Sequence, residues 1–264
     1  MNDHICSSII HMLSTSSSRL TPSQIYERLN IPVPRRDFMK KIKQMVIDEQ
    51  IIFTNELGST FVCLSYNKPV QISERIVLTP PKRLFHTKNE STIIIKLLSG
   101  SSFGNGQHPT TCLILKQLDT LLLENQNHTI HKALDVGTGT GVLAIAAAKL
   151  GVPNIIATDR DRLAVYEANN NILINGLNDH IEVMCSDCIP DGHFQLILAN
   201  LRYPTLCSIA EQFYQKLDIA GFCICSGFTG EEFDDLLETF DKNHFKCKNF
   251  MQKNKWFGAT FIKQ

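Results

Sequence analysis

The chain has 264 residues and no net charge, with 43% hydrophobic and 20% charged residues, a balance typical of a soluble globular protein. This length accommodates one complete α/β domain and a smaller second one. No apolar run approaches the ~20 residues needed to span a bilayer. No basic segment followed by an apolar core begins the chain, so neither a membrane anchor nor an export signal is predicted.

Nine cysteines, an odd number, are spread along the chain, which is typical of reduced thiols and predicts a cytoplasmic protein. Two pairs, Cys185 with Cys188 and Cys223 with Cys225, are spaced closely enough for zinc binding. Because neither pair has histidine partners at the spacing of a zinc site, we expect free thiols and no metal.

The charge is distributed unevenly along the chain. Residues 1–90 contain 12 basic and 8 acidic residues, whereas the remainder contains 14 basic and 18 acidic ones. This shift, together with the helix-breaking Pro69 and the Pro80-Pro81 pair, indicates a boundary between two domains. The predicted parts are a first domain at 1–67, a connector at 68–92 and a second domain at 93–264.

The first domain has the pattern of three helices followed by a two-stranded hairpin, which resembles a winged helix-turn-helix domain. The predicted helices are 5–13, 22–29 and 35–49, and the predicted strands are 51–54 and 59–64. In the third helix, Arg36, Lys40 and Lys43 form a basic stripe opposite the apolar face. Such a stripe can enter a nucleic-acid groove; protein docking and a solvated scaffold face are the open alternatives.

The second domain begins with a predicted strand at 93–98 and a loop that contains Gly104 and Gly106. These glycines permit a loop that closes over a ligand. The helix that follows starts at Pro109, and its Thr110 and Thr111 offer hydroxyl and N–H groups to an anion such as a carboxylate. His108 either contacts substrate or caps this helix, and the cap is the favoured interpretation.

A glycine motif, Asp135-x-Gly137-x-Gly139-x-Gly141, separates an apolar strand from an apolar helix. This arrangement puts backbone N–H groups and the positive end of a helix against a bound cofactor. A dinucleotide fingerprint would need glycine at Val142. The acidic residue two positions before the first glycine suits an ammonium group, so the motif predicts S-adenosylmethionine (AdoMet) as the cofactor.

Acidic residues also end the next two predicted strands. Asp159 follows the strand at 154–158 and can accept hydrogen bonds from both ribose hydroxyls. Asp187 ends the strand at 180–187 and can accept the adenine amino group. The alternative, that both are ordinary loop carboxylates, is disfavoured because an acid ends each of three successive strands.

The fourth strand, predicted at 194–200, delivers Asn200 to the carboxyl edge of the sheet, where doubly wound sheets hold their active sites. With Tyr203-Pro204, it loosely resembles the Asn-Pro-Pro-Tyr motif of methyltransferases that act on amines and amides. In such a site the Asn oxygen accepts an N–H bond from the substrate nitrogen and aims its lone pair at the methyl group. Tyr203 packs against the substrate or has a structural role.

Later elements complete the pattern. A strand at 219–226, a helix at 231–240 and a closing hairpin at 245–251 and 256–262 give seven strands with helices on both faces. The predicted fold is therefore α/β, a Rossmann-like doubly wound sheet of the class I methyltransferase type, with an N-terminal winged-helix-like domain.

Three segments together resemble the ribosomal-protein methyltransferase A (PrmA) family over roughly 93–264. They are the loop Phe103-Gly104-x-Gly106-x-His108-Pro109-Thr110-Thr111, the glycine motif, and Ala199-Asn200-Leu201. The resemblance implies AdoMet-dependent methylation of amino groups of a large-subunit ribosomal protein, with cofactor contacts at the positions of Thr111, Gly137, Asp159 and Asn200. The sequence departs from the family at Asn105, where threonine is usual, and in lacking the pattern of the family's ferredoxin-like N-terminal domain.

The sequence thus predicts an AdoMet-dependent N-methyltransferase that acts on a protein amino group. The alternatives are a nucleic-acid base methyltransferase and a DNA-binding regulator that senses AdoMet. The predicted catalytic residues are Asn200 and Tyr203. The predicted cofactor-binding residues are Phe103, Gly104, Gly106, Thr110, Thr111, Asp135, Gly137, Thr138, Gly139, Gly141, Asp159, Arg160, Asp187 and Asn200.

Overall fold

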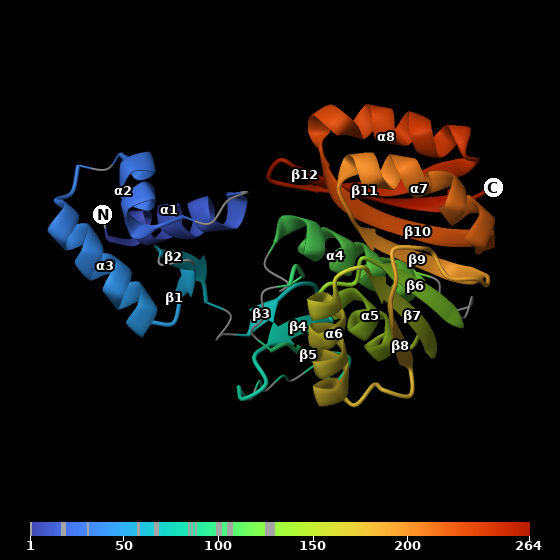
Figure 1. Cartoon of the computed structure of the whole chain (residues 1–264), viewed down its shortest axis with the longest axis horizontal. Helices are drawn as coiled ribbons and strands as arrows, with labels where there is room; N and C mark the ends of the chain where they lie inside the picture. Colours follow the sequence, from blue (N-terminus) through green and yellow to red (C-terminus); the bar gives the residue numbers. More distant parts are fainter. Residues whose placement is uncertain are drawn as a thin grey trace. The chain divides into compact units, whose positions relative to one another are not determined.

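The chain divides into two compact units, Met1–Pro69 and Val70–Gln264, whose elements are labelled in Figure 1. The computed structural model describes residues 2–16, 20–30, 32–56, 59–65, 69–83, 85, 87, 89–98, 102–104, 108–124 and 130–264. Among these residues, no helix combines the length and the apolar composition that crossing a membrane requires.

The first unit has the predicted order of three helices and a hairpin. Its elements are α1 (Asn2–Thr15), α2 (Pro22–Leu29), α3 (Arg35–Ile47), β1 (Ile51–Glu56) and β2 (Ser59–Leu64), with β1 and β2 antiparallel. A capping box starts α2: the Thr21 side chain accepts from the Gln24 N–H, and the Gln24 side chain accepts from the Thr21 N–H. The winged-helix assignment stays a prediction.

Helix α3 has the two faces that its sequence predicts. Phe38, Ile42 and Met45 are buried in the core of the first unit. The basic stripe of Arg36, Lys40 and Lys43 is exposed, and Lys40 forms an ion pair of 2.9 Å with Asp37 one turn earlier. Burial of the apolar face therefore leaves the basic residues facing solvent.

The second unit is built around a seven-stranded sheet of order β11-β12-β10-β9-β6-β7-β8. Its elements are β3 (Val70–Gln71), β4 (Ile76–Thr79), β5 (Ile93–Lys96), α4 (Pro109–Glu124), β6 (Lys132–Val136), α5 (Val142–Lys149), β7 (Asn154–Asp159), α6 (Arg162–Asn175), β8 (Ile181–Cys185), β9 (Phe194–Asn200), α7 (Tyr203–Lys216), β10 (Leu217–Thr229), α8 (Gly230–Lys242), β11 (Phe245–Lys253) and β12 (Trp256–Lys263). All neighbouring strands from β8 to β10 are parallel, and β12 is antiparallel to β10 and β11. The carboxyl ends of β6 to β10 therefore share one edge.

Helices cover both faces of this sheet, as predicted. Alternate residues of β9 enter different cores, because side chains alternate between the faces of a strand. Leu196 and Leu198 pack on the face covered by α4 and α5, while Ile197 and Ala199 pack on the face covered by α7 and α8. The prediction of a doubly wound α/β sheet is confirmed.

The structure corrects the prediction of an extended connector at 68–92. Strands β3 and β4 lie in this segment and form a three-stranded sheet with β5, in which β4 and β5 are parallel. Ile76, Val77 and Leu78 are buried, so this run belongs to the core of the second unit. Strands of two and four residues, as β3 and β4 are, are too short to give a periodic hydrophobic signal in the sequence. Pro80 and Pro81 end β4, but β4 still belongs to the second unit.

A buried ion pair fastens this small sheet to α4. Arg75 Nε donates to Asp119 Oδ1 at 2.6 Å, and a terminal guanidinium nitrogen donates to the Asp119 carbonyl at 2.9 Å. The side chains are 17% and 4% exposed. Removing one partner of such a pair leaves a charge that is largely withdrawn from water.

We expect Asp119→Ala to lower the free energy of unfolding by about 3 kcal/mol, because Arg75 then loses its buried counter-charge. The measurement is urea unfolding followed by the fluorescence of Trp256, the one tryptophan in the sequence and a reporter of the second unit. Glu238→Ala is the matched control, since the exposed Lys242–Glu238 pair should contribute less than about 1 kcal/mol. Equal losses in the two variants would contradict the structural role of the Arg75–Asp119 pair.

Candidate functional site

The glycine turn lies between β6 and α5, as predicted, at the carboxyl edge of the sheet. Gly137, Gly139 and Gly141 all have positive φ angles, of 71°, 56° and 81°. The sequence predicts that the backbone N–H groups of this turn face a cofactor. In the structure, most of these N–H groups instead donate hydrogen bonds to other groups of the protein. Gly137 and Thr138 donate to Thr158 O, Gly139 to Asp159 Oδ2, Thr140 to Phe103 O and Gly141 to Thr138 O.

These glycines permit close approach to neighbouring segments. A Cβ on Gly139 would lie 2.2 Å from the Phe103 carbonyl oxygen, and one on Gly137 would lie 2.6 Å from the Leu201 side chain. The Thr140 hydroxyl also donates to the Gly104 carbonyl at 2.8 Å. The turn therefore joins the loop before α4 to the end of β9, two of the three segments that the sequence singles out.

Asp135 is fully buried at the end of β6. Its Oδ2 accepts from the Thr138 hydroxyl at 2.7 Å and from the Ala144 N–H at 3.2 Å, which fastens the turn to the start of α5. Its Oδ1 is buried and has no hydrogen-bond partner among the described residues. Burial raises the pKa of Asp135 to about 7, although both hydrogen bonds oppose that rise. The carboxyl group thus has one oxygen left for a ligand.

Asp159 lies half-buried at the end of β7. Its two oxygens accept from Gly139 N at 2.9 Å and from Asp161 N at 3.0 Å. Since a carboxylate has about four acceptor positions, hydroxyl groups can still bind to it. Asp187 and Arg160 are exposed beyond neighbouring strand ends, and Asp187 accepts a contact of 3.4 Å from the Cys188 thiol.

Asn200 and Thr111 meet at this edge although they are far apart in the sequence. Asn200 Nδ2 donates to Thr111 Oγ1 at 3.2 Å. Thr111 is fully buried in the first turn of α4, and Asn200 is partly exposed. The hydrogen bond fixes the amide and leaves its Oδ1 without a partner among the described residues.

His108 caps α4. Its Nδ1 accepts from the Thr110 N–H at 3.4 Å and lies 2.7 Å from the Thr110 hydroxyl. Burial lowers the pKa of His108, and the nearby Lys255 lowers it further, so the ring is held neutral. This agrees with the favoured cap interpretation.

Tyr203 is the first residue of α7, where it packs against the core beneath that helix. A hydrogen bond with Cys207 raises the pKa of its hydroxyl. These contacts favour the structural interpretation of Tyr203. Gly106, another predicted residue, lies outside the described residues.

Several residues at this edge were not predicted from the sequence. Asn171 of α6 is buried, donates to Thr140 O at 2.8 Å and accepts from Leu98 N at 2.9 Å. Gly227 has φ 112°, and a Cβ added to it would lie 2.1 Å from Leu201 O. The absence of a side chain at Gly227 therefore permits its close contact with the segment that follows Asn200. The available signals were weak: three consecutive asparagines in a helix, and one glycine in a strand.

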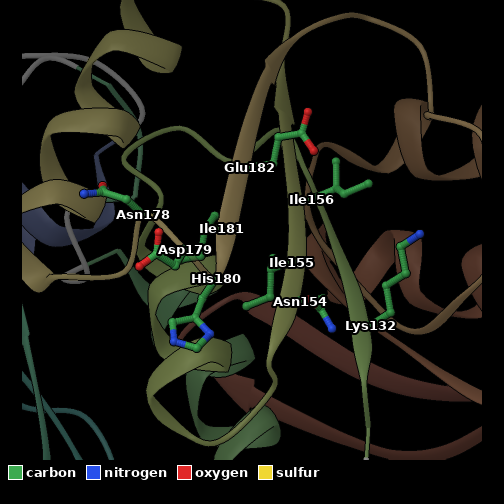
Figure 2. Close-up of a pocket in the computed structure, with 9 residues that line it drawn as sticks. All are labelled: Lys132, Asn154, Ile155, Ile156, Asn178, Asp179, His180, Ile181 and Glu182. Atoms are coloured by element: carbon green, nitrogen blue, oxygen red, sulfur yellow. The ribbon is translucent and has the colours of Figure 1, made fainter.

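A pocket of about 440 Å³ lies elsewhere, at the amino ends of β6, β7 and β8 (Figure 2). Polar residues, among them Lys132, Asn154, His180 and Glu182, line it together with isoleucines. It contains none of the predicted site residues, because parallel strands put their amino ends at the edge opposite Asn200. We therefore assign the candidate site to the carboxyl edge.

The chain is similar in sequence and in fold to known proteins. A family model described as ribosomal protein L11 methyltransferase (PrmA) matches residues 60–264. A ribosomal protein L11 methyltransferase of an Exiguobacterium species is 34% identical over 193 residues, which cover 72% of this chain and 60% of that protein. The protein of the same name from Geotalea daltonii is 34% identical over 198 residues, covering 72% of this chain and 63% of the relative.

A solved structure of a ribosomal protein L11 methylase from Lactobacillus delbrueckii subsp. bulgaricus is also similar. It aligns with a TM-score of 0.65 and 28% identity, over 76% of this chain and 100% of that chain. The chain spans about 60% of the length of the curated relatives that it matches.

The close approach at Gly139 predicts a selective effect of a single methyl group. Gly139→Ala should displace the Phe103 segment and speed hydrogen exchange of the Thr140 amide, which bonds to Phe103 O at 3.0 Å. Gly176→Ala is the control, since it has φ 69° but no atom within 4 Å of the added carbon. It should cost only about 1 kcal/mol of backbone strain and leave Thr140 protected. Unchanged exchange at Thr140 in Gly139→Ala would refute the steric argument.

Proposed function

Because the chain belongs to the ribosomal protein L11 methyltransferase (PrmA) family, we propose that it is an AdoMet-dependent methyltransferase that modifies an amino group of a protein. The observation that carries this proposal is the meeting of Asp135, Asp159 and Asn200 at one edge of the sheet. The names of the relatives support a ribosomal protein as the acceptor. We assign the activity to the cytoplasm, in keeping with the free cysteines.

The residues present fit AdoMet. The buried Oδ1 of Asp135, which has no partner in the described part of the chain, suits the ammonium of the methionine end, and the carboxylate of Asp159 suits two ribose hydroxyls. Asp187, two residues beyond the neighbouring strand β8, suits the adenine amino group. Bound AdoMet supplies a methyl group on a positively charged sulfur.

Asn200 is the residue that would orient the acceptor. With Nδ2 held by Thr111, its Oδ1 can accept an N–H bond from an amine and fix the direction of the nitrogen lone pair. A lysine-type amine has a free pKa of ~10.4 and must lose a proton before it attacks. Partial burial of the site favours that loss, because desolvation disfavours the charged form.

The nucleic-acid alternative rests on one observation, the exposed basic stripe of Arg36, Lys40 and Lys43 on α3. Methyl transfer from radiolabelled AdoMet into fractionated extract separates the two acceptors. A labelled, nuclease-resistant protein band is expected. Label that disappears on nuclease treatment would instead identify a nucleic acid, and salt-dependent duplex binding would then accompany it.

Asn200→Ala should reduce turnover by about 100-fold or more, because the acceptor nitrogen loses its positioning partner. The unfolding midpoint should change little, as the side chain is partly exposed and makes one hydrogen bond among the described residues. Turnover is measured at saturating AdoMet, because Asn200 is also a predicted cofactor contact. Asn169→Ala, on the exposed part of α6, is the control and should keep full activity. Full activity of Asn200→Ala would exclude the proposed role.

The raised pKa of Asp135 predicts proton release when AdoMet binds. In the free protein at pH 6.5 the group is mostly protonated, since its pKa is about 7. A bound ammonium stabilises the ionised form and lowers this pKa, so a proton leaves. Calorimetry in two buffers of different ionisation enthalpy measures the release, which should decline as the pH rises above 7. Methylthioadenosine, which lacks the ammonium, should bind without proton release; release with both ligands would contradict the assignment.

A further inference from the structure

Three aromatic side chains from separate segments of the second unit form a continuous row, which we call the aromatic row: Phe103, His108 and Trp256. The ring centroids of Phe103 and His108 are 4.9 Å apart, and those of His108 and Trp256 are 5.4 Å apart. Both pairs meet edge to face, with interplanar angles of 61° and 62°. This is the favourable geometry for aromatic pairs, so each ring orients the next.

The aromatic row lies at the same edge of the sheet as Asn200. His108 caps α4 directly ahead of Thr111, the partner of Asn200. Trp256 is aligned with Thr229 at the end of β10, three residues beyond Ser226, which is aligned with Asn200. The row therefore lies at the edge of the sheet that carries the amide proposed to orient the acceptor.

The aromatic row already contacts one cationic side chain of this protein, that of Lys255. Lys255 Nζ lies 5.3 Å from the centroid of the Trp256 ring, within the range of cation–π attraction. Phe103 is 53% exposed, so much of its ring is open to solvent. His108 is held neutral by burial, and its ring therefore adds no repelling charge.

A second feature of Trp256 also indicates a ligand. Its indole N–H is buried and has no hydrogen-bond partner among the described residues. Buried donors are almost always paired in folded proteins, and an acceptor oxygen on an incoming peptide would pair this one.

We propose that the aromatic row recognises the alkylammonium group of the acceptor, and that Lys255 is a resident cation that competes for the same ring. The inference rests on the proposed methyltransferase function and adds the residues that select a cationic acceptor. The sulfonium of AdoMet is the other onium group that could meet these rings, and the experiment separates the two.

The probe is choline, and its neutral isostere 3,3-dimethylbutan-1-ol is the matched control ligand. Trp256 is the one tryptophan in the sequence, so its fluorescence reports the row directly. Choline should change the fluorescence saturably and bind several-fold more tightly than the isostere. Equal affinities for the two probes would overturn the proposal.

Two variants test the residues. Lys255→Gln should strengthen choline binding several-fold, because the competing ammonium is gone, whereas Phe103→Leu should weaken it. Lys246→Gln makes the same change of charge at an exposed position of β11, away from the row, and should leave choline binding unchanged. Equal effects of the two lysine variants would show general electrostatics and contradict the competition.

The same titrations with saturating AdoMet identify the source of the onium group. Choline binding that persists beside AdoMet supports an acceptor site. Choline displaced by AdoMet would assign the rings to the sulfonium and overturn the proposal. Calorimetry with AdoMet alone distinguishes failure of the proposed function from failure of this inference. Absence of AdoMet binding refutes the proposed function, whereas AdoMet binding without choline binding refutes only the inference about the aromatic row.

Discussion

The contact of Gly139 with the carbonyl oxygen of Phe103 is the constraint on which the candidate site depends. Any side chain at position 139 would force these segments apart. Once they touch, Thr140 can donate to Phe103 O and to Gly104 O, and Asn171 can hold the same turn from α6. Phe103 and Gly104 are thereby held by contacts of their backbone, so they are placed before any ligand arrives.

Unlike the contacts around Gly139, the burial of Asp135 is unfavourable for the free energy of the ligand-free protein. A buried carboxyl group whose second oxygen finds no partner among the residues described costs free energy in the ligand-free protein, and the hydrogen bonds from Thr138 and Ala144 offset only part of that cost. A residue with a structural role alone would be better served by an amide, which carries no charge. The carboxyl group is therefore best explained by a cationic ligand, whose binding relieves the cost.

Much of the second unit follows from the sequence because its signals are local. The glycine turn, the strand ends at Asp159 and Asn200, and the closing hairpin each depend on short stretches of apolar periodicity or turn chemistry. The confirmed family resemblance rests on the same motifs.

What the sequence could not predict are contacts between distant segments. The N–H groups of the glycine turn are used within the protein because Thr158 and Phe103 happen to lie beside them, and no spacing rule contains that information. Likewise, β4 is four residues long, and the burial of its apolar run depends on packing within the unit. The contact between Trp256 and His108 also has no local signal, because the two residues are far apart in the sequence and only the fold brings them together.

The proposed site must handle two cations in different ways, which explains why it uses two kinds of side chain. The ammonium of AdoMet stays charged, so a carboxylate such as Asp135 suits it. The acceptor amine must become neutral before it attacks, and a carboxylate beside it would raise its pKa and keep it protonated. An aromatic row attracts a cation by only about 0.5–2 kcal/mol, too little to prevent loss of the proton. Weak attraction by Trp256 and its neighbours, with orientation by Asn200, is therefore the combination that admits a charged amine and still lets it react.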